Sequence, residues 1–422
     1  MNHFKYRDNA LYCEDVPVKE IAARIGTPFY LYSHATLKRH FQVFSEAFEG
    51  IEKLICYSAK ANTNLAVLKL FADLGCGLDI VSGGELYRGL NAGFSPERIV
   101  YSGVGKTVEE IDYALDSGIL MFNVESLAEL EQINRRAGKL KKRAPVSIRI
   151  NPDVDPRTHP YTATGLKKNK FGISHDLAID TYRVAGQLEN LDIVGVDCHI
   201  GSQITEAEPF QAALQNLIGL IKELNASGMN IRYLDMGGGL GITYADETPP
   251  PLQEYAGAII SQVKDMELQL ILEPGRVLVG NAGILVTEVL YRKSGEVKNF
   301  IIVDAGMNDL LRPTLYNAFH AIEPVENSRE DVIVADVVGP ICESGDFLAV
   351  DRSIADVQSG DLMAVMSAGA YGFVMSSNYC SRPRVAEVMV KGDRFNVVKA
   401  RESYEDLVRG ETVPPFLETK KE

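Results

Sequence analysis

A lysine at the end of a short apolar run is the first residue of this 422-residue sequence whose chemistry needs an explanation. The run "LICYSA" (54–59) predicts a buried strand, and Lys60 follows it directly. The amine there either lies in a surface salt bridge or is buried. A buried amine in apolar surroundings has a lowered pKa and can act as a nucleophile or form a Schiff base. Lys60 alone does not decide between these alternatives.

Three consecutive glycines follow another apolar run, in "DMGGGLGI" (235–242). Such glycines let backbone N–H groups converge on an anion, typically a phosphate, and a tight turn is the alternative. The spacing matches neither G-x-G-x-x-G nor the Walker A motif with its lysine. Dinucleotide and nucleoside triphosphate binding therefore lose support.

An acid and a histidine follow two further apolar runs. Glu273, in "LEPGRVLVG" (272–280), is costly to bury unless a cation meets it. That cation could be Arg276 or the protonated ring nitrogen of a cofactor. His199, in "CHIGSQI" (198–204), could stack on a flat ring or be a core histidine bonded to the backbone, and Ser202 could donate to a phosphate.

If these groups lie at one site, they can all serve the same cofactor. An amine that forms Schiff bases, a phosphate nest, a carboxylate for a ring nitrogen and an imidazole that stacks together describe pyridoxal 5′-phosphate. We therefore predict that Lys60 holds this cofactor. The six cysteines lie far apart without a C-x-x-C pair, so no metal site is predicted.

Further candidates lie in the last third of the sequence. In "VVGPICESGDFLA" (337–349), Cys342 and Glu343 follow Gly-Pro on a polar loop, where a reactive thiol and a small buried thiol are comparable alternatives. Arg312 and Tyr316 form a donor pair suited to a carboxylate. Tyr371 lies close to glycines, where its hydroxyl could reach phosphate or substrate.

Eight short apolar runs supply the elements that position these groups. They alternate with amphipathic helical stretches and cover residues 53–59, 77–82, 98–103, 120–126, 145–151, 193–200, 231–237 and 268–274. This alternation predicts parallel βα units closing into a (β/α)8 barrel of the TIM type, with an open doubly wound sheet as the alternative. The candidate residues fall at the carboxyl ends of the runs, where barrel active sites are built.

After about residue 281 the pattern changes to strands separated by Gly, Pro and Asp turns, which predicts a mostly antiparallel β domain. We expect the barrel to span 28–280, and residues 1–27 to join 281–422 in the β domain.

Composition limits the partners and the location. The net charge is −14 and the longest basic run is Lys141–Arg143, which disfavours nucleic acid and anionic membrane surfaces. The charged N-terminus has no signal-peptide core, and the long uncharged stretch 362–381 is too polar to span a membrane. With the scattered cysteines, these features predict a cytoplasmic protein.

At these residues the chain resembles the bacterial diaminopimelate decarboxylases, of the alanine racemase-like class of pyridoxal phosphate enzymes. The resemblance covers nearly the whole chain, through "YSAKAN", "HPYTATGLKKNKFGI", "HIGSQI", "GGGLGI", "EPGR", "DAGMNDLLRPTLY", "GPICESGD" and "AYGFVMSSNY". "CESGD" together with "RPTLY" is its specific part. Related ornithine and arginine decarboxylases have an aspartate after the cysteine and lack the arginine–tyrosine pair.

The resemblance implies a role for each candidate residue. Lys60 holds the cofactor, His199 stacks on its ring and Glu273 pairs with the ring nitrogen. The other expected cofactor contacts are Ser202, Gly238, Gly239, Pro274, Gly275, Arg276 and Tyr371, and the expected substrate contacts are Arg276, Arg312, Tyr316, Glu343 and Tyr371. Cys342 is the expected proton donor, and Cys380 has no expected role.

The implied reaction is decarboxylation of meso-2,6-diaminopimelate at its D-centre to L-lysine and carbon dioxide, the last step of lysine biosynthesis. The resemblance also implies a homodimer with shared active sites. Two alternatives stay open at this point, a decarboxylase of another basic amino acid and a non-catalytic cofactor-binding protein of the same fold.

Overall fold

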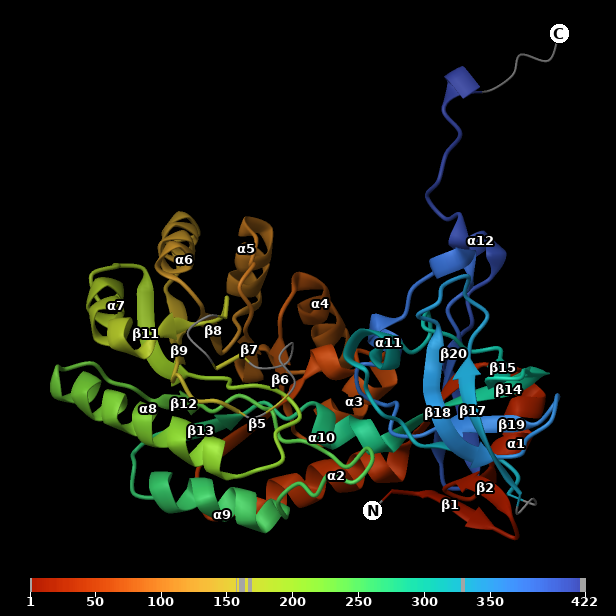
Figure 1. The fold of residues 1–422 in the computed structure, drawn as a ribbon. Helices are drawn as coiled ribbons and strands as arrows, with labels where there is room; N and C mark the ends of the chain where they lie inside the picture. Colours follow the sequence, from red (N-terminus) through yellow and green to blue (C-terminus); the bar gives the residue numbers. More distant parts are fainter. Residues whose placement is uncertain (1, 157, 159–163, 166–168, 328–330, 418–422) are drawn as a thin grey trace.

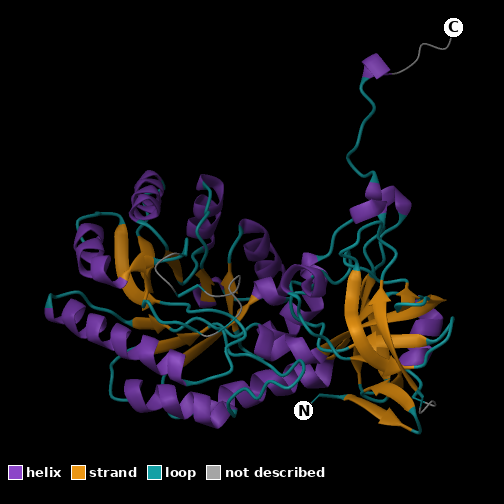
Figure 2. Cartoon of the chain, viewed as in Figure 1, coloured by secondary structure: helices purple, strands orange, loops and turns teal. Residues whose placement is uncertain are grey.

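The computed structural model describes residues 2–156, 158, 164–165, 169–327 and 331–417, and in this part of the chain eight parallel strands close into a barrel (Figures 1 and 2). The barrel strands are β5 (Lys53–Ser58), β6 (Gly77–Ile80), β7 (Ile99–Tyr101), β8 (Met121–Val124), β9 (Ala144–Asn151), β11 (Leu191–Asp197), β12 (Tyr233–Asp235) and β13 (Gln269–Leu272). Pairing of β13 with β5, and of β8 with β9, closes the ring and excludes the open sheet.

Each barrel strand lies within or overlaps one of the eight predicted runs, because a parallel strand buried on both faces needs apolar residues at nearly every position. The short strand β10 (Ile173–Ser174) adds a further parallel pairing beside β9. The run 231–237 yields a strand of only three residues, and Gly237, with φ of +63°, already belongs to the following turn.

Helices surround the barrel and alternate with its strands (Figure 2). They are α2 (His34–Ala47), α3 (Leu65–Asp73), α4 (Gly83–Ala92), α5 (Val108–Ser117), α6 (Leu127–Lys139), α7 (Ala178–Ala185), α8 (Glu208–Ala226), α9 (Leu252–Val263) and α10 (Arg276–Val279). Helix α5 shows why they form. Thr107 and Glu110 make a capping box at its start, Ile111 and Ala114 bury one face, and left-handed Gly118 ends it.

The second part of the chain is a β domain, as predicted. Its strands are β4 (Phe29–Ser33), β14 (Gly283–Ser294), β15 (Asn299–Val303), β16 (Ile322–Pro324), β17 (Val332–Val338), β18 (Phe347–Ala355), β19 (Leu362–Val365), β20 (Ala386–Lys391) and β21 (Arg394–Lys399). Most of their pairings are antiparallel, and β15–β17 and β4–β20 are parallel. Two short helices belong to this part, α11 (Arg312–Tyr316) and α12 (Tyr404–Leu407).

The N-terminal segment packs against this domain. Strands β1 (Phe4–Arg7), β2 (Ala10–Cys13) and β3 (Val16–Pro17) form a small sheet of their own, followed by α1 (Val18–Ile25). A bridge between Ala10 and Glu326 joins this sheet to the β domain. The division into 28–280 and 1–27 with 281–422 stays a prediction. Strand β4, just after its first boundary, pairs with β14 and β20 of the β domain.

The two parts meet at the end of the barrel where the strands finish, here called the barrel mouth. The Tyr371 N–H donates to the carbonyl of Ala61 (2.8 Å), and the Asn62 amide donates to the carbonyl of Gly369 (3.1 Å). Helix α11 lies between barrel and β sheet in Figure 1. These contacts bring residues of the β domain to the barrel mouth.

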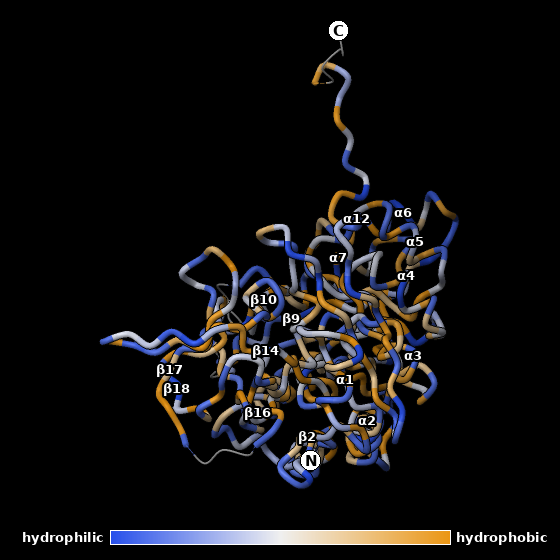
Figure 3. Tube along the Cα trace, turned by 90° about the vertical axis from the view of Figure 1, so that its right-hand side faces the viewer, coloured by the Kyte–Doolittle hydropathy of each residue, from blue (hydrophilic) through white to orange (hydrophobic). Residues whose placement is uncertain are grey.

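Apolar and polar residues alternate in short stretches along the chain (Figure 3). Among the described residues, no helix has the length and apolar character needed to cross a bilayer.

Candidate active site

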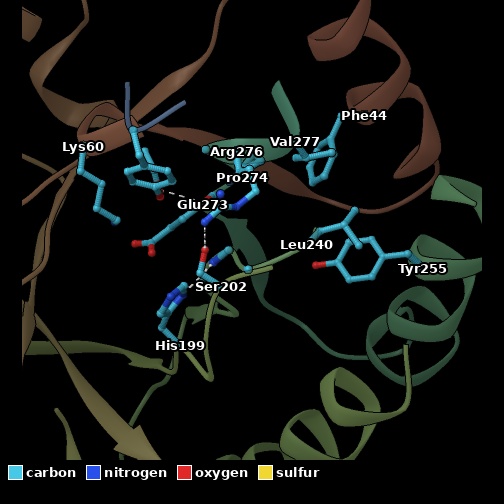
Figure 4. Close-up of a pocket in the computed structure, with 16 residues that line it drawn as sticks. Phe44, Lys60, His199, Ser202, Leu240, Tyr255, Glu273, Pro274, Arg276 and Val277 are labelled. Carbon is cyan, nitrogen blue, oxygen red and sulfur yellow. Dashed lines mark hydrogen bonds between the residues drawn. The ribbon is translucent and has the colours of Figure 1, made fainter. Parts of the chain in front are cut away.

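The barrel mouth gathers the side chains that are expected to contact the cofactor (Figure 4). Lys60 lies in a 3-10 turn directly after β5, His199 follows β11 by two residues, and Glu273 comes directly after β13. One cavity is lined by these three residues together with Ser202, Gly237, Gly238, Gly239, Pro274, Gly275, Arg276 and Tyr371. The expected cofactor residues are therefore neighbours in space.

Lys60 lies among carboxylates. Its Nζ donates to Oδ2 of the buried Asp79 (2.5 Å), which also accepts from the hydroxyl of Ser58 (2.8 Å). Burial lowers the pKa of Lys60, but the charges of Asp79 and Glu273 outweigh it and leave that pKa above its ordinary value. Of the two surroundings that the sequence left open, the amine is buried but lies in a salt bridge with a carboxylate and not in apolar surroundings.

Glu273 is buried, at 4% exposure, and accepts a bond from the hydroxyl of Ser102 (3.3 Å). Burial, followed by the neighbouring charges of Asp235 and Asp79, raises its pKa well above the ordinary value. Arg276, the side chain that could have paired with Glu273, donates instead to Tyr244 and Ser202. A cationic ring nitrogen beside Glu273 would favour its charged form and offset the cost of burial.

The glycine loop packs closely against the backbone of this acid. A Cβ on Gly238 would lie 2.1 Å from the carbonyl oxygen of Glu273, and one on Gly239 would lie 2.4 Å from that of Gly201. Two loop N–H groups are already bonded, that of Gly237 to Asp235 Oδ1 (2.9 Å) and that of Gly238 to His199 Nδ1 (3.2 Å). The loop backbone therefore packs too closely on neighbouring backbone for any side chain at Gly238 or Gly239, and only part of its N–H set could serve an anion.

His199 is neutral in this arrangement. Burial and then the charges of Arg149 and Lys60 hold its pKa well below the ordinary value. Since Nδ1 accepts from Gly238, the ring proton lies on Nε2. A neutral, flat imidazole at the cavity wall suits stacking on an aromatic ring.

Arg276 supplies positive charge at the other side of the cavity. It is 7% exposed, and its guanidinium donates to the hydroxyls of Ser202 (2.8 Å) and Tyr244 (2.8 Å). The guanidinium carbon lies 4.9 Å from the ring centroid of Tyr371, whose backbone is left-handed. Within the described residues, Arg276 Nε is buried without a hydrogen-bond partner. This donor set fits the phosphate of pyridoxal phosphate.

A second cavity, of about 540 Å³, continues from the first into the space between barrel and β domain. This volume is typical of small-molecule sites. Lys60, His199 and Arg276 line it from the barrel side, and Arg312, Tyr316 and Tyr371 line it from the β domain. The structure thus brings both arginines of the expected substrate site to the same space as Lys60.

Cys342 and Glu343 are the exceptions. Both are exposed on the loop between β17 and β18, and neither is among the described residues that line the two cavities above. The hydroxyl of Thr314, on α11, donates to the carbonyl of Gly345 in this loop (2.6 Å). The loop therefore packs on the helix that carries Arg312 without entering the cavities of its own chain.

A family model described as "Pyridoxal-dependent decarboxylase, pyridoxal binding domain" matches residues 34–280. The diaminopimelate decarboxylase of Aquifex aeolicus is 52% identical over 96% of each chain, and that of Vibrio cholerae is 52% identical over 98% of this chain and 100% of its own. The chain belongs to the diaminopimelate decarboxylase family.

Solved structures of the family agree with the fold. A crystal structure of the M. jannaschii diaminopimelate decarboxylase in complex with L-lysine has a TM-score of 0.94 at 38% identity, covering 99% of this chain and all of that one. The Helicobacter pylori enzyme, also complexed with L-lysine, has a TM-score of 0.90 at 45% identity and covers 93% of this chain and 98% of its own.

Membership of this family confirms the predicted class, a pyridoxal phosphate-dependent amino-acid decarboxylase. The alternative of a non-catalytic binding protein loses its support. In the motif "HPYTATGLKKNKFGI", residues 159–163 and 166–168 lie outside the described residues.

Sequence reasoning missed the carboxylates inside the decarboxylase barrel. Asp79, Asp197 and Asp235 are buried on three different strands. Burial, followed by the charge of Asp197, raises the pKa of Asp235 to about 8. The sequence does contain one indication of these aspartates, since each of them interrupts an apolar run, as in "GLDIVS" and "VGVDCHI". It also missed Tyr244 and His320, which contact the two arginines from other segments.

Proposed function

We propose that this chain decarboxylates meso-2,6-diaminopimelate at its D-centre and leaves L-lysine and carbon dioxide, as the last step of lysine biosynthesis in the cytoplasm. The observation that carries the proposal is the shared cavity of Lys60, Arg276 and Arg312. Two guanidiniums suit a substrate with a carboxylate at its far end, and the far ends of ornithine and arginine have none. The six free cysteines are consistent with a reducing compartment.

Lys60 would hold pyridoxal phosphate through its amine, with His199 against the ring and Glu273 beside the ring nitrogen. The remaining proposed cofactor contacts are Ser202, Gly238, Gly239, Pro274, Gly275, Arg276 and Tyr371. When bound, the cofactor supplies an electron sink for the pair of electrons left behind by the departing carboxylate. Glu273 acts by keeping a proton on the ring nitrogen.

The chain's own residues orient the substrate. Arg312, Arg276 and Tyr316 bind its distal carboxylate, with Tyr371 beside them, and Glu343 accepts from the distal ammonium. Charge-assisted bonds to both distal groups place the other end of the substrate at Lys60. Cys342 then gives a proton from Sγ to the carbon that has lost its carboxylate, as a general acid.

We further propose that Cys342 and Glu343 act in the cavity of a second subunit. Both are exposed and lie outside the cavities that Lys60 and Arg312 line. A two-fold homodimer would present this loop to the partner's barrel mouth, and the same contact would occur twice. This arrangement explains why the proton donor and the amine lie apart in one chain.

The test is product formation by purified protein supplied with pyridoxal phosphate. We expect carbon dioxide and L-lysine in equal amounts from meso-diaminopimelate, and at least a hundredfold lower kcat/KM with L-ornithine or L-arginine. If activity on L-ornithine or L-arginine were comparable, meso-diaminopimelate would not be the specific substrate. Cofactor binding without carbon dioxide from any of the three would contradict the proposed function.

A further inference from the structure

His320 is a fully buried histidine that contacts Arg312, one of the residues proposed to bind the distal carboxylate of the substrate. Its Nε2 lies 2.7 Å from an Nη1 nitrogen of Arg312, and its Nδ1 lies 2.8 Å from the carbonyl oxygen of Met366. A carbonyl only accepts and a guanidinium only donates. His320 must therefore be neutral, with its proton on Nδ1 toward Met366 and its lone pair on Nε2 toward Arg312.

The surroundings of His320 favour this neutral form. Arg352 donates to its backbone carbonyl (2.8 Å), and the charges of Arg312, Arg276 and Arg352 all act on its ring. Burial, followed by the charge of Arg312, lowers its pKa to about 3. His320 accepts from Arg312 without a charge of its own, so it can position the guanidinium without neutralising it.

Tyr244 completes the arrangement from the barrel side. Its hydroxyl accepts from Arg276 (2.8 Å), and its ring centroid lies 4.5 Å from the guanidinium carbon of Arg312. The ring also packs edge-on against His320, with centroids 5.2 Å apart. Two like charges in a buried cavity repel each other unless neighbouring groups compensate. The Tyr244 ring face and the His320 lone pair provide that compensation without neutralising either arginine.

We propose that His320 is a positioning residue for recognition of the distal carboxylate: as a neutral acceptor it fixes the Arg312 guanidinium against Tyr244, while the other N–H groups of Arg312 remain for the substrate. This inference rests on the proposed function. A fixed planar guanidinium loses little freedom when a carboxylate binds, which increases affinity for ligands that carry this group.

The test compares two ligands in two variants. L-Lysine carries the carboxylate that Arg312 would hold, and 1,5-diaminopentane is the same molecule without it. His320→Leu removes the acceptor, and His320→Gln retains an acceptor for Arg312 and a donor for Met366. We expect His320→Leu to weaken L-lysine binding about ten- to a hundredfold, the loss typical of a bond to a charged group, and to change 1,5-diaminopentane binding less than about twofold. His320→Gln should recover L-lysine binding to within about fivefold of wild type.

Steady-state kinetics gives a second readout. His320→Leu should raise KM for meso-diaminopimelate about ten- to a hundredfold and change kcat less than about threefold. In a protein that already carries Arg312→Ala, the same substitution should raise KM by a further factor of less than about two. If His320→Leu does not fold, His320→Met takes its place as the apolar variant.

Three results would overturn the inference: equal weakening of both ligands, no rescue by glutamine, or an undiminished effect in the Arg312→Ala background. A wild-type protein that makes no L-lysine would instead contradict the proposed function, and the ligand-binding comparison would still decide the role of His320.

Discussion

Asp79 and Glu273 determine the charge of Lys60 at the scale of single residues. The amine donates to Asp79 and lies in the same cavity as the expected ring contacts His199 and Glu273. Its neighbours therefore hold it as an ammonium aimed into the cavity, and binding of the cofactor aldehyde must displace its proton.

The first prediction concerns this attachment. Borohydride treatment of the protein with its cofactor should fix pyridoxal phosphate to the peptide that contains Lys60, and peptide mass spectrometry measures the label. Lys60→Ala should lose both the label and the activity. Label on another lysine would remove Lys60 from its assigned role.

The second prediction concerns Arg312. Arg312→Ala should lower kcat/KM for meso-diaminopimelate by roughly ten- to a hundredfold, because a bond to a charged group contributes about 1.5–3 kcal/mol. Arg312→Lys keeps the charge without the planar fork and should recover only part of the loss. Cofactor absorbance serves as the control and should not change. An unaltered kcat/KM in Arg312→Ala would mean that the carboxylate binds elsewhere.

The third prediction concerns the titration of His320. The unfolded chain gains a proton on this residue below its ordinary pKa of 6.5, whereas the folded chain gains it only near 3. Between these values the unfolded state binds more protons, so the free energy of unfolding falls as the pH is lowered. His320→Gln should remove up to about 1.4 kcal/mol of this loss per pH unit. Denaturant unfolding at several pH values between 4 and 7 measures it, and parallel curves for both proteins would contradict it.

Single residues were predictable where the chemistry is local to a motif. Lys60, His199 and Glu273 end apolar runs, and barrel geometry then brings strand ends together. Asp79, Tyr244 and His320 were not found, because their importance comes from partners on other elements. Nothing local to Tyr244 indicates that it lies between two arginines that follow it by 32 and 68 positions.

At the scale of elements, the loop between β17 and β18 shows how one buried acid shapes a site. The Asp346 carboxylate accepts from the N–H groups of Met307 (2.6 Å) and Ile341 (2.6 Å). The bond from Ile341 closes the segment that carries the exposed Cys342, and the bond from Met307 ties this segment to the chain that follows β15. Nothing in the sequence around Asp346 indicates these two bonds, which hold the loop in the structure.

The fourth prediction follows from these bonds. Asp346→Ala should lower kcat about tenfold or more and change KM less, because each lost charge-assisted bond contributes about 1.5–3 kcal/mol to the loop that carries the proton donor. Ser344→Ala, an exposed position on the same loop, is the matched control and should behave as wild type. Equal kcat in the two variants would show that Asp346 does not position Cys342.

The barrel strands and their parallel arrangement were predictable, and the pairing of strands in the β domain was not. Eight apolar runs indicated eight parallel strands, and a purely local pattern was sufficient for that. Strand β4 precedes the barrel in sequence but pairs with β14 and β20, which lie more than 240 residues later. Register and partner depend on these distant contacts, so the parallel β4–β20 pair in a mostly antiparallel domain left no signal in the sequence.

At the scale of the whole molecule, the barrel mouth of one chain supplies only some of the proposed active-site residues. Lys60, Arg276 and Arg312 line the cavities of their own chain, and Cys342 and Glu343 are exposed on a loop that does not. The proposed homodimer joins the two halves, since a two-fold axis applies each contact twice.

Subunit complementation tests this claim most directly. Lys60→Ala and Cys342→Ala proteins, each nearly inactive alone, are mixed and allowed to exchange subunits, and mass-tagged protomers verify the exchange. About half of the dimers are then heterodimers, and each has one doubly altered and one intact site, so activity should recover to roughly a quarter of wild type. If Cys342 served the barrel of its own chain, every site would keep one substitution. No recovery after demonstrated exchange would therefore contradict the shared site.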